Sequence, residues 1–228
     1  MPPRTSNVSG FTLLDELPDL SYEASDGSSG TLHEYFRGAW GVLFSHPDDF
    51  TPICTTEIAE LARLEQADEF KSRNTRLMGL SCNDAESHQR WIKDIEAYSN
   101  SSVNFPVIAD PLRIIASRLG MLSQDDMDKD SLPLTVRTLF VLDPQVRIRL
   151  MLTYPASTGR NMCELLRVID SLQLTSAHPV ATPVNWKKGT PVCIAANLSN
   201  EEIEKTFQDI VIENLPSNKE YLRFTSDL

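Results

Sequence analysis

Cys54 has the surroundings that a reactive thiol requires. It follows a loop that contains Pro47 and Pro52, and the periodicity of the apolar residues after it places it at the start of a helix. Unpaired backbone N–H groups and the helix dipole stabilise a thiolate at such a position. Thr51 lies three residues upstream, so we expect its hydroxyl to reach the same sulfur. The pattern predicts a nucleophilic cysteine, and the alternative is a buried, inert one.

The other three cysteines are Cys82, Cys163 and Cys193. No two cysteines form a CxxC pair, and none has zinc-site spacing with a histidine, which disfavours dithiol chemistry and a metal centre. We expect Cys193 to be structural, in a strand, and Cys163 to be partly buried beside the core face of its helix. Cys82 follows a predicted strand at its carboxyl end, where α/β folds place ligand sites, so a position near Cys54 stays open.

The composition excludes several classes of function. The chain has 228 residues, with 21 basic and 32 acidic side chains and a net charge of −11, which argues against a nucleic-acid-binding protein. Four cysteines are too sparse for a disulfide framework. The N-terminus lacks the pattern of a signal peptide, and no apolar run is long enough for a membrane span. We therefore expect a cytoplasmic protein.

Strands and helices alternate between residues 40 and 174, which predicts an α/β sheet. Apolar runs predict strands at 40–45, 77–81, 105–109, 136–142 and 146–154. Helical periodicity predicts helices from Cys54 onward and at 86–98, 112–119 and 161–174. The composition changes after Leu174, so we predict one domain over 1–174 and a small C-terminal domain over 175–228, with a helix at 201–207.

The residues around Cys54 resemble the active-site loop of the peroxiredoxins, whose core is Pro-x-x-x-Thr-x-x-Cys. Residues 46–57 read His-Pro-Asp-Asp-Phe-Thr-Pro-Ile-Cys-Thr-Thr-Glu, which is similar to the 1-Cys peroxiredoxins of the peroxiredoxin 6 class. The similarity covers roughly residues 10 to 228 and continues in order through Leu80-Ser81, His88…Trp91, 136–144, 154–161, 171–174 and 180–186.

This resemblance implies a thioredoxin-like fold with a central mixed sheet flanked by helices, and a small C-terminal α+β domain that mediates dimerisation. It also implies a thiol-dependent peroxidase that reduces hydrogen peroxide and organic hydroperoxides, lipid hydroperoxides included. Cys54 would be the peroxidatic nucleophile and would be oxidised to a sulfenic acid.

The resemblance gives roles to residues around that thiol. Thr51 would bond to the thiolate and the peroxide, and Pro47 would shield the site from water. Arg137 would stabilise the thiolate and the developing oxyanion. An arginine at the start of a strand usually faces water, but between apolar neighbours on a buried strand it needs an anionic partner.

Three further residues are implied as supporting groups. Glu57 and Arg160 would form the charge network that orients Arg137. His46 would be a polar group behind the site, although an ordinary loop histidine is the alternative.

A resolving cysteine is absent. Two-cysteine members of the family carry it in a Val-Cys-Pro motif before a C-terminal tryptophan, and here residues 180–183 read Val-Ala-Thr-Pro before Trp186. An external thiol, from glutathione or the thioredoxin system, would therefore reduce the sulfenic acid through a mixed disulfide. No cofactor or metal is expected, and the resemblance implies a homodimer, with higher oligomers open.

Some members of this class also act on phospholipids, with a serine in Gly-x-Ser-x-Gly, a histidine and an aspartate. Here Ala39 stands at the serine position and Gln145 at the aspartate position, so that only His33 remains. Alanine is not a nucleophile, and glutamine does not orient a histidine as a carboxylate does. We expect no phospholipase activity by this mechanism.

A second class of function would use the same thiol without turnover, as a redox sensor or a holdase chaperone. A sensor reacts once and stops, whereas a peroxidase consumes peroxide as long as a thiol donor lasts. A thioredoxin-like disulfide reductase is a third class, and the chain lacks its CxxC motif.

Overall fold

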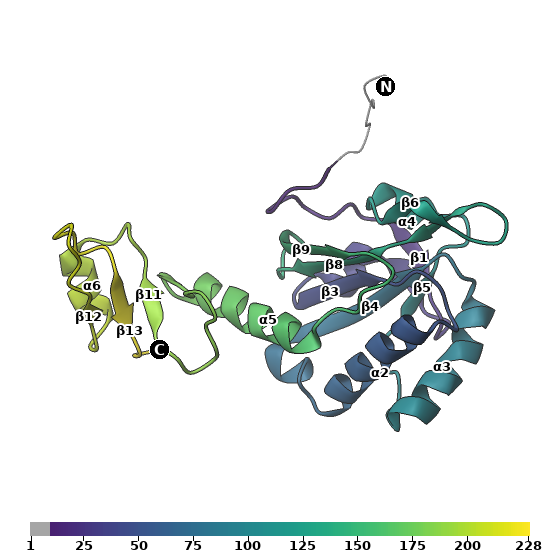
Figure 1. Ribbon diagram of the computed structural model, residues 1–228, viewed down its shortest axis with the longest axis horizontal. Helices are drawn as coiled ribbons and strands as arrows, with labels where there is room; N and C mark the ends of the chain where they lie inside the picture. The colour runs from purple at the N-terminus through teal and green to yellow at the C-terminus, as the bar shows by residue number, and fades with distance from the viewer. Residues whose placement is uncertain (1–9) are drawn as a thin grey trace, which may run out of the picture. The chain divides into compact units, whose positions relative to one another are not determined.

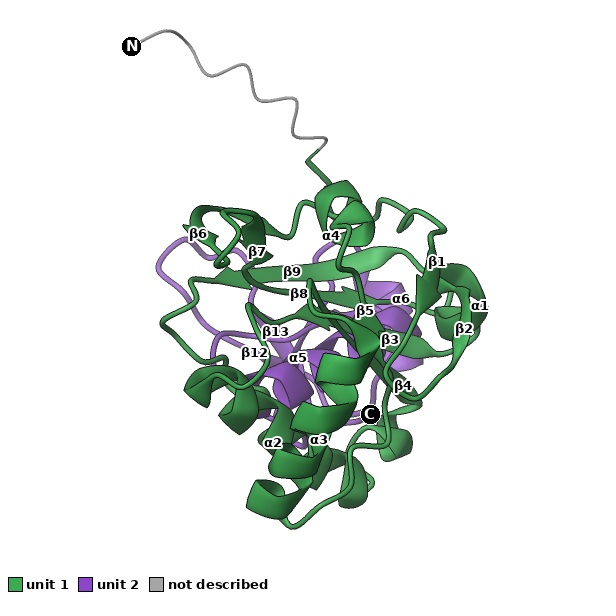
Figure 2. Cartoon of the chain, turned by 90° about the vertical axis from the view of Figure 1, so that its right-hand side faces the viewer, with its two compact units in different colours: residues 1–162 green, residues 163–228 purple. Residues whose placement is uncertain are grey.

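The computed structural model describes residues 10–228, which form two compact units divided between Met162 and Cys163 (Figure 2). The predicted boundary at residue 174 lies later, because helix α5 (Met162–Ala177) bonds to the segment that follows it. Ser171 shares a hydrogen bond with Thr182, and Arg167 donates to the carbonyl oxygen of Trp186. The helix therefore belongs with the C-terminal residues.

A five-stranded mixed sheet forms the centre of the first unit, in the order β5-β4-β3-β8-β9 (Figure 1). Strands β3, β4 and β5 are parallel, whereas β8 runs antiparallel to both β3 and β9. The five predicted strands are confirmed, as β3 (Trp40–Ser45), β4 (Thr75–Ser81), β5 (Val107–Ala109), β8 (Arg137–Leu142) and β9 (Ile148–Tyr154). Every residue of β3 and β8 is buried, because helices cover both faces of the sheet.

Helices α2 (Pro52–Gln66) and α3 (Ala85–Ser99) pack beside each other on one face of the sheet (Figure 1). Helix α4 (Ile114–Arg118) packs into the core on the other face, where Ile115 joins Leu43 of β3. These are the predicted helices. Proline suits the first position of α2, because its missing N–H would have no partner there.

Several short elements of the first unit have no apolar pattern and were not predicted. They are β1 (Ser21–Glu23), β2 (Ser29–Thr31), α1 (Leu32–Phe36), a 3-10 helix (Lys71–Arg73), β6 (Leu122–Met127) and β7 (Pro133–Thr135). Helix α1 begins with a capping box. The side chain of Thr31 accepts from the backbone N–H of Glu34, and the Glu34 carboxylate accepts from the backbone N–H of Thr31.

The second unit combines α5 with a four-stranded antiparallel sheet, in the order β10-β11-β13-β12. Its elements after α5 are β10 (Val180–Ala181), β11 (Val192–Ile194), α6 (Asn200–Thr206), β12 (Val211–Ile212) and β13 (Arg223–Thr225). Trp186, Ile203 and Phe207 are part of its own apolar core. The predicted α+β architecture is confirmed, and no helix among residues 10–228 is long and apolar enough to cross a membrane.

Candidate active site

Cys54 is the third residue of α2 and is fully buried. The loop 46–51 connects the carboxyl end of β3 to this helix, so that the thiol lies where α/β folds place ligand sites. Its sulfur lies 3.4 Å from Nη1 of Arg137. A helix N-terminus and a guanidinium therefore both face one sulfur, and both stabilise negative charge on it.

Arg137, the first residue of β8, is 2% exposed and held by three partners. Its Nη1 donates to Oε2 of Glu57 over 2.7 Å as well as to the Cys54 sulfur. Its Nε and Nη2 both donate to the carbonyl oxygen of Ala156, over 3.0 and 2.7 Å. The anionic partner expected for a buried arginine is Glu57, and the planar guanidinium is fixed on both of its edges.

Glu57 lies between two arginines. Its Oε1 accepts from the backbone N–H and Nε of Arg160 over 2.7 and 2.9 Å, and its Oε2 accepts from Arg160 Nη2 and Arg137 Nη1. Burial opposes ionisation of Glu57, but the charge and hydrogen bonds of Arg160 hold its pKa below the usual 4.5. Two guanidinium cations and one carboxylate leave one net positive charge beside Cys54.

Thr51 does not bond to Cys54 as the sequence led us to expect. Its hydroxyl donates to the carbonyl oxygen of Asp48 over 2.9 Å, inside the turn that precedes α2. Because a hydroxyl carries one hydrogen, it is not also a donor to the sulfur in this conformation. Its lone pairs remain able to accept a hydrogen bond.

Pro47 and His46 are both buried at the start of the loop. His46 Nε2 lies 2.9 Å from Oδ1 of Asp49, whereas His46 Nδ1 has no hydrogen-bond partner. Burial lowers the pKa of His46, although Asp49 opposes this shift. His46 is therefore a neutral ring that donates to a carboxylate within the loop, and it is not an ordinary exposed loop histidine.

The structure also brings together His46, Asp49 and His88, which are scattered in the sequence. All three are buried, and their ligand atoms lie within 4.8 Å of one another, an arrangement that could also hold a metal ion. Sequence reasoning missed this cluster, because Asp49 and His88 meet only through the fold. The sequence does contain one indication of it: His88 and Trp91 are three residues apart, which places both on the buried face of α3.

The other cysteines differ from Cys54 in their surroundings. Cys82 is 9% exposed, its sulfur lies 3.9 Å from the carbonyl oxygen of Pro133, and burial raises its pKa to about 11. Cys193 lies in β11 as predicted, opposite Ala181, and burial raises its pKa. Cys163 is exposed, which corrects the prediction of partial burial: it lies on the solvent side of α5.

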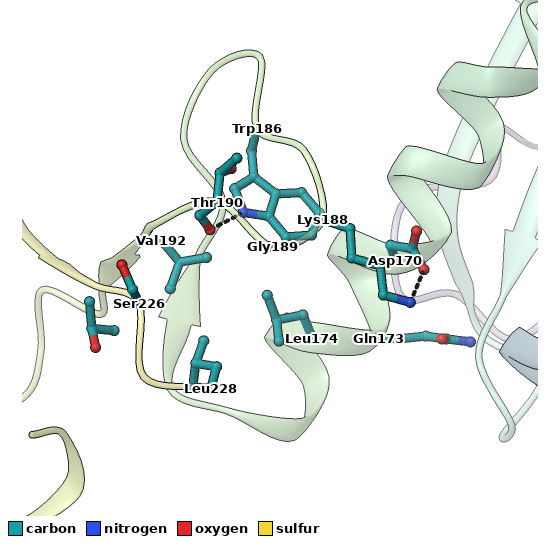
Figure 3. Close-up of a pocket in the computed structure, with 11 residues that line it drawn as sticks. Asp170, Gln173, Leu174, Trp186, Lys188, Gly189, Thr190, Val192, Ser226 and Leu228 are labelled. Atoms are coloured by element: carbon teal, nitrogen blue, oxygen red, sulfur yellow. Dashed lines mark hydrogen bonds and ion pairs between the residues drawn. The ribbon is translucent and has the colours of Figure 1, made fainter. Parts of the chain in front are cut away.

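A pocket of about 400 Å³ opens in the second unit (Figure 3). Trp186 and Leu174 line it, and the Lys188 ammonium lies 3.4 Å from the Asp170 carboxylate at its edge. The pocket contains no predicted site residue and no cysteine. The candidate site is therefore confined to the first unit.

The sequence matches two families of known proteins. Residues 13–151 match the AhpC/TSA family, and residues 171–209 match the C-terminal domain of 1-Cys peroxiredoxin. The chain is 46% identical over 219 residues to the 1-Cys peroxiredoxin of Medicago truncatula, covering 95% of this chain and 99% of that protein. It is 45% identical over 221 residues to Peroxiredoxin-6 of Gallus gallus, covering 95% and 97%.

Solved structures are similar over the same length. A crystal structure of the peroxiredoxin 6 of Arenicola marina superposes with a TM-score of 0.91 at 39% identity, covering 95% of this chain and 98% of that one. The yeast mitochondrial 1-Cys peroxiredoxin superposes with a TM-score of 0.84 at 41% identity, covering 95% and 99%. The thiol resolving mechanism of that yeast protein operates via glutathione/thioredoxin systems.

Proposed function

The chain belongs to the 1-Cys peroxiredoxins of the AhpC/TSA family, which makes it a thiol-dependent peroxidase, and we propose that Cys54 is the thiol at which it reduces peroxides. The observation that carries this assignment is the 3.4 Å contact between the Cys54 sulfur and Arg137 Nη1. Both side chains are buried, and the sulfur lies in the first turn of α2. Among the described residues, no other cysteine has a hydrogen bond with a guanidinium.

In the first step the Cys54 thiolate attacks one peroxide oxygen. A sulfur–oxygen bond forms as the oxygen–oxygen bond breaks, and the leaving oxygen takes a proton to become water or an alcohol. The sulfur is oxidised to a sulfenic acid and the peroxide is reduced. Hydrogen peroxide and organic hydroperoxides, lipid hydroperoxides included, carry this same bond.

Arg137 stabilises the charge that moves through this step. Its Nη1 faces the sulfur, so it stabilises the thiolate before attack and the developing oxyanion during attack. Glu57 and Arg160 are positioning residues, because Glu57 bonds to Arg137 and Arg160 in turn bonds to Glu57, which keeps the Arg137 guanidinium in place. Pro47 excludes water from the loop side. Thr51 accepts a hydrogen bond from the peroxide O–H, since its own proton is directed at Asp48.

The sulfenic acid is then reduced by an external thiol. One thiol condenses with it to give a mixed disulfide and water, and a second thiol attacks that disulfide and releases Cys54. The yeast relative supports glutathione or the thioredoxin system as the donor. This cycle needs no metal or bound cofactor.

Phospholipase activity by a serine triad is not part of this function. Ala39 is buried and supplies no nucleophile. Gln145 is exposed in the turn after β8, and Nε2 of His33 already forms a hydrogen bond with the carbonyl oxygen of Leu17. A hydrolytic rate with phospholipid that survives Cys54→Ser would contradict this statement.

The protein works as a homodimer in the cytoplasm. The match to the C-terminal domain of 1-Cys peroxiredoxin supports the dimer. The location is supported by the need for external thiols to regenerate Cys54, because the cytoplasm keeps thiols reduced. Sedimentation of the purified chain tests the dimer, and a monomer at micromolar concentration would contradict it.

The direct test of the function is peroxide consumption by wild type and Cys54→Ser with glutathione, thioredoxin or no donor. We expect sustained turnover by wild type with one donor and none by Cys54→Ser. A single stoichiometric reaction with every donor would favour the redox sensor. Loss of turnover only in Cys82→Ser or Cys193→Ser would overturn the assignment of Cys54.

A further inference from the structure

The carboxylate of Asp49 lies at the centre of the active-site loop and accepts three hydrogen bonds. The donors are Nε2 of His46 over 2.9 Å, Nδ1 of His88 over 2.9 Å and the hydroxyl of Ser87 over 2.7 Å. The Asp49 side chain is 1% exposed. Burial alone would favour its neutral form, but the bonds from the two histidines hold its pKa below the usual value. Asp49 is therefore a buried anion.

His88 connects this carboxylate to a neighbouring strand. Its Nδ1 faces the Asp49 carboxylate, and its Nε2 lies 3.2 Å from the carbonyl oxygen of Ile108 in β5. Both neighbours are acceptors only, so both ring nitrogens are satisfied when both carry a proton. The buried pair of Asp49 and His88 thus connects the active-site loop to α3 and β5.

Helix α3 also contacts the first turn of α2. Trp91 lies three residues after His88, and its Nε1 donates to the hydroxyl of Thr55 over 3.1 Å. Thr55 is the residue after Cys54, and its hydroxyl donates to the carbonyl oxygen of Thr51. The Trp91 ring lies against that of His46, with centroids 4.9 Å apart. His88 and Trp91 together hold both ends of the segment that carries Cys54.

Two further hydrogen bonds fix the same loop from the segment between β4 and α3. Asn83 donates from Nδ2 to Oδ1 of Asp48 over 2.7 Å and accepts from the backbone N–H of Asp49 over 3.2 Å. The loop 46–51 is therefore bound by side chains from outside its own sequence. The Cys54–Arg137 contact requires a fixed loop, because β8 carries Arg137 independently of it.

We propose that Asp49 and His88 are positioning residues of the peroxidase, whose buried hydrogen bond fixes the loop 46–51 and the first turn of α2 so that Cys54 faces Arg137. This proposal rests on the proposed role of Cys54. Neither residue touches the reacting atoms. A displacement of about 1 Å at a reacting centre can reduce a rate by about a hundredfold, so this hydrogen-bonded pair contributes to the rate through geometry.

The test compares Asp49→Asn, His88→Gln and the double variant with Asp143→Asn as the matched control. Asp143 is also a buried carboxylate, 1% exposed, which accepts from the backbone N–H groups of Gln145 and Arg147 at the far end of β8 from Arg137. Two rates are measured on the folded protein at one temperature: oxidation by hydrogen peroxide, and alkylation of Cys54 by iodoacetamide. Alkylation needs the thiolate, as oxidation does, but it produces no oxyanion for Arg137 to stabilise.

We expect peroxide oxidation to fall at least about tenfold in Asp49→Asn and His88→Gln, while alkylation changes less than about threefold. The double variant should lose no more than the worse single variant, since the pair acts as a unit. Asp143→Asn should keep the wild-type ratio of the two rates. If Asp49→Asn does not fold, His88→Gln alone supplies the comparison.

Three results would overturn the proposal. The first is a lowered thermal midpoint in Asp49→Asn and His88→Gln with wild-type rates for the folded protein, which would make the pair structural only. The second is an equal fall in Asp143→Asn. The third is stoichiometric metal in wild type whose removal by a chelator abolishes activity, which would make His46, Asp49 and His88 a metal site. Peroxidase activity in Cys54→Ser would instead refute the proposed function itself.

Discussion

Two buried thiols of the first unit occupy similar places and have opposite surroundings. Cys54 lies beyond the carboxyl end of β3, and Cys82 lies beyond the end of the neighbouring parallel strand β4. The Cys54 sulfur lies 3.4 Å from a guanidinium nitrogen, whereas the Cys82 sulfur faces the carbonyl oxygen of Pro133. The position on the sheet is shared, but the chemistry is not.

The balance of nearby charge explains the difference. Around Cys54 two arginines face one carboxylate, Glu57, which leaves one positive charge for a thiolate. The charges that act on Cys82 are those of one arginine, Arg113, and two carboxylates, Asp110 and Asp128, and the Arg113 guanidinium already donates to Pro133 and Asp128. Burial without an available cation raises the pKa of Cys82 to about 11. Burial thus protects a thiol or activates it, depending on the charge buried with it.

Arg137→Met should have the largest effect on the difference in reactivity between Cys54 and Cys82, because it leaves Cys54 buried without a neighbouring cation. Removal of one donor to a developing oxyanion typically lowers a rate by about 10²–10³, and we expect a loss of that size in oxidation by hydrogen peroxide. Arg137→Lys should recover only part of it, since an ammonium lacks the planar fork that bonds to Glu57 and Ala156. Stopped-flow fluorescence measures the rates, and a loss below about tenfold in Arg137→Met would contradict this account.

Glu57→Gln tests the charge balance while keeping the shape of the side chain. It leaves two buried guanidiniums without their shared carboxylate, and breaking a buried ion pair costs about 3–5 kcal/mol. We expect the free energy of unfolding, measured by urea titration, to fall by about that amount. A change below about 1 kcal/mol would mean that the arginines are compensated elsewhere.

The loss of stability at acidic pH tests the same balance of buried charge. The folded-state pKa values of Glu57 and Asp49 lie below their unfolded values of 4.5 and 3.8. The unfolded chain therefore binds more protons, and the stability from these groups is present above about pH 5 and is lost as the pH falls toward the folded values. Urea midpoints should decline over this range in wild type and less steeply in Glu57→Gln. Equal slopes would show that Glu57 is not the titrating group.

Cys82→Ser should have the smallest effect. Because the Cys82 thiol has no available cation, we expect peroxide turnover within about twofold of wild type, with Cys193→Ser as the matched control at a second inert thiol. The assay is the same peroxide consumption used for Cys54→Ser. A loss of turnover above about tenfold in Cys82→Ser alone would place a second redox thiol near the first.

The sequence predicted the elements that carry an apolar run or a helical apolar stripe, and it missed those that carry neither. The run at 40–45 is apolar up to its last residue, Ser45, and the strand has the same bounds in the structure. Strand β6 reads LSQDDM and is largely exposed, so no hydrophobic pattern marks it, and it forms through its pairing with β7. The domain boundary was placed too late because a composition change at Leu174 does not show which unit α5 joins.

The sequence pattern alone drew attention to Cys54, because it follows a proline-containing loop at the start of a helix. Arg137 and Glu57 were implied by the resemblance to the peroxiredoxins, and the structure places Arg137 in contact with both Cys54 and Glu57. The direction of the Thr51 hydroxyl was not predictable, because it depends on the turn of the loop. The contact between Asp49 and His88 joins residues far apart in the chain, and it exists only once α3 has packed beside α2.

Cys54 as the single oxidised thiol is the central claim, and mapping of the first sulfenic acid tests it most directly. The reduced protein is treated with one equivalent of hydrogen peroxide in the presence of dimedone, and the adduct is located by peptide mass spectrometry. We expect the adduct on Cys54 alone, with Cys82, Cys163 and Cys193 unmodified and no disulfide formed. An adduct on Cys82 with Cys54 unmodified, or a disulfide that joins Cys54 to another cysteine of the chain, would contradict the account.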